Sequence, residues 1–497
     1  VIVVDVSGAD ARSGDTRARG SFVLALESVP RFESMDVLFQ PLRVRLVDEV
    51  LERDSLIDGY INGAVSGTGP LDLMDIRADL TLTDLDEAVR PSFVTVAGGL
   101  AIVEPRDMQD LEFTFLDFDP RWTAVVGITH QVRGRVEGDT RLSGTVGQWF
   151  DFESDLAHQL PSGASSRVSG SGSVVLEDEP GVTVEFMTDP LSLAALQPYA
   201  PPDVELVGDV RGPLSARGLF SDLRVLADLR TPRGLVNFDG RFDLMAEERS
   251  YDARLAARDI QLRQWVEQAP ATRLAVEGRV RGTGTDPATL EATFDLTILR
   301  SLVEGARVDS SLLRFTLSKG LATADTFAIR TDAGRVRGRG SFGLAEETSG
   351  SLILDVDAPN LASWNRWIVP GRNPARQDTS LEGLFAAFPG EEEAAPGAPE
   401  TAVSQPPDTI AGSLQALGVL YGNVHDFSFG GRLHGRQIQY GPFEADSVVL
   451  TVDIDDPRLL DRLTASATVR GLAGGGTTLD SVEVLWDRMD STTSDVD

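Results

Sequence analysis

The chain has 497 residues, of which 41% are hydrophobic, 7% are aromatic and 48 are glycine, a composition that suits strands and turns better than helices. Its 77 acidic residues outnumber its 45 basic residues and give a net charge of −32, which argues against nucleic acid or an anionic bilayer surface as an electrostatic partner. Because the chain has no cysteine, disulfides, cysteine-ligated metals and thiol catalysis are excluded.

The first part of the chain predicts short strands separated by proline- and glycine-containing turns. Strands are expected at residues 1–6, 19–24 and 76–82, and a longer one at 55–69. In the longer strand, alternation places the following residues on one face: Ile57, Gly59, Ile61, Gly63, Val65 and Gly67. Residues 84–89, which precede Pro91, predict a short helix with Asp84 as its N-cap.

The same succession of strands and a short helix returns three times along the chain. Strand-like runs at 172–176 and 182–186 precede a helix-like run at 190–196, and those at 240–248 and 251–256 precede one at 260–266. The last copy has runs at 340–347 and 352–356, followed by a helix-like run at 361–368. Self-similarity of this kind indicates a repeat architecture in which each unit stacks on its neighbours.

The clearest strand pattern lies between residues 274 and 368. Within it, apolar and polar residues alternate strictly along the run 290–298: Leu290, Ala292, Phe294, Leu296 and Ile298 are separated by Glu291, Thr293, Asp295 and Thr297. Alternation with a period of two places one face of a strand against apolar material and the other in water. The turns between these runs contain the Gly, Asp and Pro residues that are expected between hairpin strands.

Residues 371–408 are rich in Pro, Ala and Glu and predict a disordered insertion, because they cannot bury enough apolar surface to fold. We therefore expect a repetitive β segment over residues 1–370, the insertion at 371–408, and a continuation of the β segment over 409–497. No run approaches the roughly 18 apolar residues of a transmembrane helix. Because the chain opens directly on a strand-like run, we interpret it as an excerpt of a longer protein.

Motifs for catalysis or metal binding are weak, and we expect no enzyme, no cofactor and no metal. His425 and His434 fall on neighbouring runs and would face each other across a hairpin, but a metal site needs a third ligand. Glycines between 334 and 340 lie inside a strand-like run that no helix follows, which disfavours a phosphate loop. Acidic residues gather in two places that invite comparison with calcium sites, without the loop spacing of one: Asp453, Asp455 and Asp456, and Asp117 and Asp119.

Two all-β architectures suit the alternation. In closed sandwiches the inward residues form a core, whereas in an open, curved sheet they line a groove, and a long exposed apolar strip marks a binding surface. We favour a repetitive antiparallel meander that forms a long, curved, open hydrophobic groove, with short helices closing the repeat units. Alternating glycines permit the twist that such a sheet needs.

Two runs carry a resemblance to a known family. They are Leu-x-x-x-Gly-x-Val-x-Gly-x-Gly-x-Asp-Pro at 274–287 and Leu-x-Thr-Ala-Asp-x-Phe-x-Ile-Arg-Thr-Asp-Ala-Gly-Arg-Val-x-Gly-x-Gly at 321–340. With the closing helices, they resemble the AsmA-like proteins, which include the TamB-type translocation and assembly proteins. The resemblance implies a periplasmic protein, anchored in the inner membrane by a part outside this excerpt, that moves phospholipid toward the outer membrane along a hydrophobic groove.

On that implication, acyl chains would lie on inward apolar residues: Leu290, Phe294, Leu296, Leu313, Phe315, Leu317, Phe327, Ile329, Phe342, Leu352 and Leu354. Phospholipids are then the expected partners, with outer-membrane assembly proteins as further ones. The alternative is a structural or assembly protein of the outer membrane that holds client β-strands at the edges of its sheet. Which face of the sheet is concave stays open at this point.

Overall fold

A computed structural model describes residues 2–51, 57–86, 88–126, 131–200, 204–266, 269–284, 289–365, 409–454, 463–474 and 476–487. These residues form 28 strands and five short helices. The expected insertion at 371–408 lies outside the described residues, so its disorder and the domain boundaries that it sets stay predictions.

The strands up to residue 243 are β1 Ile2–Ser13, β2 Thr16–Leu26, β3 Arg31–Arg43, β4 Gly59–Pro70, β5 Met74–Asp84, β6 Ser92–Leu100, β7 Asp107–Phe118, β8 Arg135–Thr145, β9 Trp149–Gln159, β10 Ser165–Val175, β11 Gly181–Ser192, β12 Asp209–Leu219, β13 Leu223–Arg230 and β14 Leu235–Asp243. The remaining strands are β15 Ser250–Ile260, β16 Thr272–Thr283, β17 Glu291–Ile298, β18 Ser301–Val303, β19 Ala306–Val308, β20 Ser311–Ser318, β21 Leu321–Thr331, β22 Gly334–Gly343, β23 Gly350–Ala358, β24 Ile410–Gly422, β25 Phe427–Tyr440, β26 Phe443–Ile454, β27 Leu463–Gly474 and β28 Thr477–Asp487. The helices are α1 Val44–Leu51 and the 3₁₀ helices η1 Pro120–Val126, η2 Leu193–Tyr199, η3 Leu262–Gln264 and η4 Leu361–Trp364.

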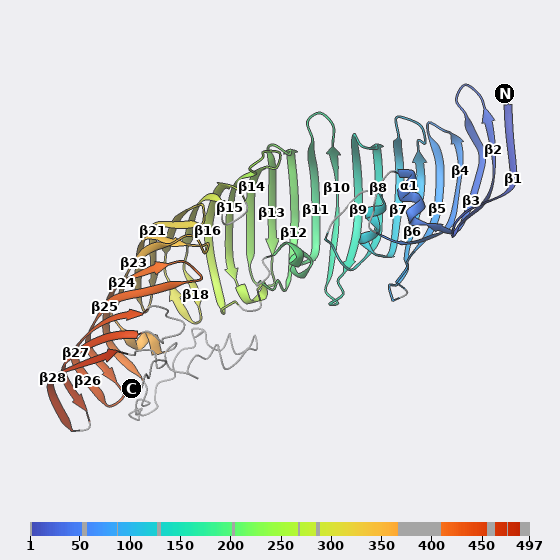
Figure 1. Cartoon of the computed structure of the whole chain (residues 1–497). Coiled ribbons are helices and arrows are strands. Elements are labelled where there is room, and N and C mark those ends of the chain that lie inside the picture. The colour runs from blue at the N-terminus through green and yellow to red at the C-terminus, as the bar shows by residue number, and fades with distance from the viewer. Residues whose placement is uncertain are drawn as a thin grey trace, which may run out of the picture. The chain divides into compact units, whose positions relative to one another are not determined.

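The chain divides into two compact units. The first comprises Val1–Pro232, Arg241–Met245 and Gln264–Gln268, and the second comprises Arg233–Gly240, Ala246–Arg263 and Ala269–Asp497. In the first unit, the strands from β1 to β13 pair antiparallel, each with the next in the sequence. Figure 1 shows these strands side by side, from blue to green.

The second unit is built in the same way from β15 onward. Each strand pairs antiparallel with the next, except that the short hairpin β18–β19 is inserted between β17 and β20, which pair directly. The hairpin adds its own bridges to β16 and β21. The expected all-β antiparallel meander is therefore confirmed in both units.

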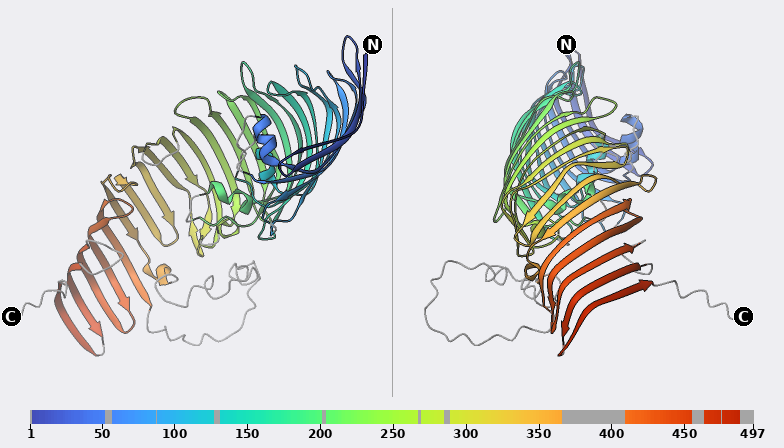
Figure 2. Two further views of the ribbon diagram at one scale, coloured as in Figure 1. Left: turned by 45° about the vertical axis from the view of Figure 1, so that its right-hand side comes forward. Right: turned by 90° about the vertical axis from the view of Figure 1, so that its left-hand side faces the viewer.

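Alternation along the strands follows from the sequence. In β9, Phe150 and Phe152 are half-buried, whereas Asp151 and Glu153 between them are exposed. In β4, Ile61, Gly63, Val65 and Gly67 share a face as expected, opposite residues of β5. Figure 2 shows the strands of the first unit forming a bent sheet with α1 on its concave side. The apolar face is the concave one there, because α1 packs on apolar strand residues.

Three of the four expected helical closures are present. The run expected at 190–196 becomes helical at η2, the run at 260–266 at η3 and the run at 361–368 at η4, although residues 366–368 lie outside the described part. The helix expected at 84–89 is wrong. There the Asp84 carboxylate accepts from the Asp86 N–H and the Asp86 carboxylate from the Ala88 N–H, at 3.0 Å each, so side chains satisfy the backbone in consecutive turns instead.

Candidate functional site: the apolar face

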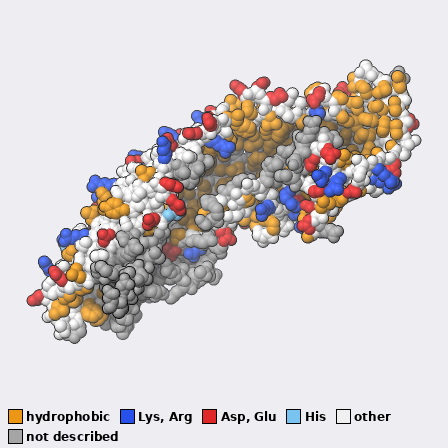
Figure 3. Space-filling model, viewed as in Figure 1, with side chains coloured by type: hydrophobic (Ala, Val, Ile, Leu, Met, Phe, Trp, Pro, Cys, Tyr) orange, Lys and Arg blue, Asp and Glu red, His pale blue; other side chains and the backbone are white. Residues whose placement is uncertain are grey.

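In the first unit, one face of the sheet is apolar from strand to strand. Leu80 of β5 lies opposite Val94 of β6, which lies opposite Phe115 of β7. Farther along, the rings of Phe152 in β9 and Phe186 in β11 approach to 5.8 Å between centroids. Figure 3 shows hydrophobic side chains gathered in a hollow over this unit, with charged side chains mainly along its margins.

In the second unit, the register brings ten of the eleven residues proposed from the sequence onto one face. Phe294 lies opposite Phe315, and their rings stack with centroids 4.8 Å apart. Leu313 lies between Leu296 and Phe327 in adjacent strands. The same pairing rows continue across the neighbouring strands through the remaining members: Leu317, Ile329, Phe342, Leu352 and Leu354.

Leu290 is the exception among the eleven. It lies in the turn before β17, where its carbonyl accepts the Lys319 N–H at 3.3 Å. All eleven residues, Leu290 included, are half-buried. A face covered by a second layer would have brought such large apolar side chains close to complete burial. Among the described residues, this apolar face is therefore lined but not covered.

Glycines let the large side chains lie flat along the sheet. A Cβ on Gly278 of β16 would meet the Leu296 side chain at 2.6 Å, and one on Gly338 of β22 would meet Phe327 at 2.9 Å and Leu354 at 3.3 Å. Both glycines have extended backbones, so these positions require glycine because of close side-chain approach. From the sequence, glycine was expected to permit twist. In the structure it also lets neighbouring apolar side chains lie close to the backbone of the sheet.

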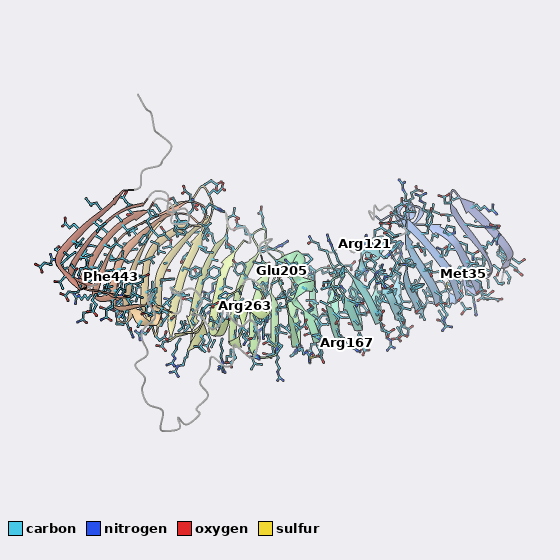
Figure 4. All side chains as sticks on the ribbon, turned by 90° about the horizontal axis from the view of Figure 1, so that it is seen from below. Met35, Arg121, Arg167, Glu205, Arg263 and Phe443 are labelled. Atoms are coloured by element: carbon cyan, nitrogen blue, oxygen red, sulfur yellow. The ribbon has the colours of Figure 1, made fainter. Side chains whose placement is uncertain are left out.

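The opposite face carries charges that are paired across strands. The Arg167 guanidinium donates to the Asp155 carboxylate at 2.7 Å, and Arg279 donates to Asp252 at 2.6 Å. The hydrogen bond from Arg279 lowers the pKa of Asp252 to about 2. Figure 4 places Arg167 on this side of the ribbon and Arg121, a residue of η1, on the other side.

At three places in the first unit, a Ser or Thr hydroxyl accepts a backbone N–H at the end of a neighbouring strand, and the sequence did not predict these contacts. Buried Ser92, at the start of β6, accepts the N–H of Asp119, just after β7, at 2.9 Å. Thr16 in the hairpin β2–β3 and Ser166 in the hairpin β10–β11 accept from Arg43 and Ser192 in the same way. Each contact lies where the chain leaves a strand for α1, η1 or η2, and thereby holds the residue just before each of these helices.

The His and Asp residues considered as possible metal ligands lie in other arrangements than the sequence suggested. His434 lies in β25 opposite Gln415 and Val449, whereas His425 lies in the turn before that strand, so the two do not face each other. Asp117 and Asp119 pair with arginines. Asp453 lies in β26, while Asp455 and Asp456 fall outside the described residues. Within the described ranges, no three His, Asp or Glu residues are grouped as metal ligands would be.

The helices that lie on the apolar face were partly missed. Neither α1 nor η1 was predicted, because residues 44–51 directly follow a strand and their run is too short for a clear helical period.

In the part of the chain that the structure describes, every helix falls short of the length and hydropathy needed to cross a membrane.

Comparison with known proteins adds no relative: no family model and no curated protein matches this chain. The resemblance to AsmA-like proteins therefore stays a prediction that rests on the two glycine-rich runs and on the closing helices.

Proposed function

We propose that this chain is a segment of a bridge-like lipid transport protein, in which the apolar face holds phospholipid acyl chains on their way across the periplasm toward the outer membrane. The observation that supports it best is the row of half-buried apolar residues in register in the second unit, together with the apolar row in register in the first. The direction of transport, the compartment and an inner-membrane anchor outside this excerpt rest on the family resemblance alone.

The proposal needs many weak and similar sites rather than one tight site. Each acyl methylene removed from water contributes about 0.8 kcal/mol, and neighbouring strands offer similar Leu, Val and Phe side chains. An acyl chain can then move from one strand to the next with little change in free energy. The close approach of Leu296 to Gly278 and of Phe327 to Gly338 supports this, because side chains that lie flat on the sheet leave space for an acyl chain above them.

The polar parts of the sheet suit the same cargo. Head groups would stay in water above the groove, because burying a charged phosphate without a partner is unfavourable. The convex face, with pairs such as Arg167 and Asp155, is a solvated surface. No reaction is proposed: the chain would hold and pass its cargo without changing it.

Native mass spectrometry of the purified chain, with lipid extraction from the same sample, tests this proposal. We expect several phospholipids to bind each chain and to exchange with added fluorescent phospholipid. A chain that purifies without lipid and takes up none would contradict the proposal.

The alternative, a protein that holds client strands at its sheet edges, finds less support. Within the described residues, the strands from β2 to β12 and from β16 to β17 pair on both sides. A client strand would therefore find no open edge along these stretches for β-augmentation. Retention of unfolded outer-membrane β-barrel segments by a lipid-free chain would favour this alternative.

A further inference from the structure

The first unit has one place where its apolar face is occupied by the chain itself. Val44 of α1 is 0% exposed and belongs to a buried cluster with Leu82 of β5, Val94 of β6 and the η1 residues Trp122 and Val125. Val47 of α1 and Phe115 of β7 pack against the same cluster. The helix therefore covers strand residues of the kind that are half-buried elsewhere along this face, and Figure 2 shows it on the concave side.

The neighbouring helix η1 is fastened by polar groups as well as by packing. Its Trp122 is 5% exposed and lies so close to β4 that a Cβ on Gly59 would meet the indole at 2.7 Å. Before it, Asp119 holds Arg121 at 2.7 Å and its N–H donates to buried Ser92. These contacts make η1 a fixed part of the sheet margin.

The residue before α1 is held by polar contacts, as is the residue before η1, whereas α1 itself packs on the apolar face. Arg43, the residue before the helix, forms ion pairs with Asp15 and Asp58, and its N–H donates to the Thr16 hydroxyl. The helix itself has eight residues, and isolated helices below roughly 12–15 residues are marginal in water. The helix is therefore stabilised mainly by packing on the apolar strand residues. Segments stabilised in this way open locally at a low cost in free energy.

We propose that α1 is a displaceable plug that competes with phospholipid acyl chains for the apolar surface around Leu82 and Val94. This inference rests on the proposed function. An acyl chain would bury the same strand residues that α1 buries, so replacing the helix by lipid changes the free energy little. Arg43 keeps the start of the helix attached meanwhile. Cargo would then pass this part of the first unit only when α1 leaves its seat, whereas η1 stays in place.

Distance measurement between spin labels tests the displacement directly, since the chain has no cysteine. One label is placed by Glu49→Cys on the exposed side of α1 and the other by Thr95→Cys on the exposed convex face of β6. We expect one narrow distance without lipid, and a second, longer distance after addition of a short-chain phosphatidylethanolamine below its micelle concentration. The matched control joins Thr95→Cys to Glu153→Cys, two convex-face positions, and should not change.

Lipid binding is measured on the same samples by native mass spectrometry. Bound lipid with an unchanged Glu49–Thr95 distance would overturn the plug and leave the proposed function standing. A change in the control distance as well would also overturn it, because the whole sheet would then be moving. Absence of bound lipid in every variant would overturn the proposed function, and the plug with it.

A variant separates a plug from a helix that only stabilises the sheet. Val44→Asp removes the central apolar contact of α1, and Arg45→Asp, at the neighbouring exposed position, is the control. A plug predicts that Val44→Asp shows the longer distance without lipid and takes up phospholipid faster than the parent chain. Slower or unchanged uptake, with the β-sheet circular dichroism signal retained, would contradict it.

Discussion

The rings of Phe294 in β17 and Phe315 in β20 stack with their centroids 4.8 Å and their planes 11° apart. These strands are not consecutive in the sequence, because the hairpin β18–β19 intervenes. The stack therefore marks where the apolar face continues past an insertion. Both rings are half-buried, so they stabilise the sheet and remain available to a ligand.

The stacked pair predicts a coupling energy. Phe294→Ala and Phe315→Ala should each destabilise the second unit, and the double variant should lose less than the sum by about 0.5–1.5 kcal/mol, the range for aromatic pairs. Chemical unfolding of the four chains measures it. Phe294→Ala combined with Phe342→Ala, three strands away in the pairing order, is the control and should be additive. Additivity in the stacked pair would show that the rings contribute only by separate burial.

Gly338 provides a test of groove depth without a change of charge. Gly338→Ala places a methyl group against Phe327 and Leu354, which we expect to lift these side chains from the floor and to lower the number of bound phospholipids. Overpacking costs about 1–3 kcal/mol, so the sheet should persist by circular dichroism. Arg337→Ala, at the neighbouring exposed position, should leave lipid binding unchanged. Equal lipid binding by Gly338→Ala and the parent chain would contradict the depth argument.

Ser92 predicts a stability effect at the margin of the first unit. Its 0% exposed hydroxyl accepts from the Asp119 N–H at 2.9 Å and the Arg135 guanidinium at 3.2 Å. Ser92→Ala leaves buried donors without that acceptor and should cost about 1–3 kcal/mol. Hydrogen exchange should rise first in η1. Thr95→Ala, on the exposed side of the same strand, is the control, and the account fails here if both variants behave alike.

Asp252 predicts a dependence on pH. Its pKa in the folded chain is about 2, lowered first by the hydrogen bond from Arg279, against about 3.9 for an ordinary aspartate. The ionised carboxylate therefore stabilises the fold above about pH 4, and this contribution is lost as the pH falls from about 4 to about 2. The effect is small, because the two side chains are 36% and 35% exposed and water screens them.

Unfolding of the parent chain and of Asp252→Asn measures this contribution. The difference between their unfolding free energies should be constant near neutral pH, shrink on acidification and shrink again with added salt. A difference that grows as the pH falls toward the pKa of Asp252 would have the wrong sign.

Alternation along the strands made the apolar face predictable. Leu296, Leu313 and Phe327 were assigned to one face from the sequence, and the register brings them together across β17, β20 and β21. This works because the side-chain period of a strand is two, so that neighbouring strands in register share their faces. Leu290 shows the limit of the argument, since its run begins in a turn before the strand does.

Local hydrogen bonding and close approach were not predictable in the same way. Asp84 was taken for a helix cap, yet its carboxylate and that of Asp86 build consecutive turns, because aspartate serves both structures equally well. Ser92 looks like any strand serine until its partner 27 residues away is known. The close packing of the Leu296 side chain on Gly278 is likewise a contact between two strands, and the pattern along one strand does not contain it.

Acyl chains are proposed to lie on the apolar face, and two adjacent leucines in the second unit test this most directly. Leu313 lies on that face between Leu296 and Phe327, whereas Leu312 is 41% exposed on the other face, opposite Thr297 and Ala328. Leu313→Asp and Leu312→Asp make the same chemical change on the two sides of one strand. A charge among acyl chains is unfavourable by several kcal/mol, while one in water is not.

The measurement is crosslinking of a phospholipid that carries a photoactivatable acyl chain, with the crosslinked residues mapped by mass spectrometry. We expect crosslinks at apolar-face residues near β20 in the parent chain and in Leu312→Asp, and their loss in Leu313→Asp with circular dichroism unchanged. Equal crosslinking in both variants, or crosslinks on the opposite face with Leu312, would contradict this assignment.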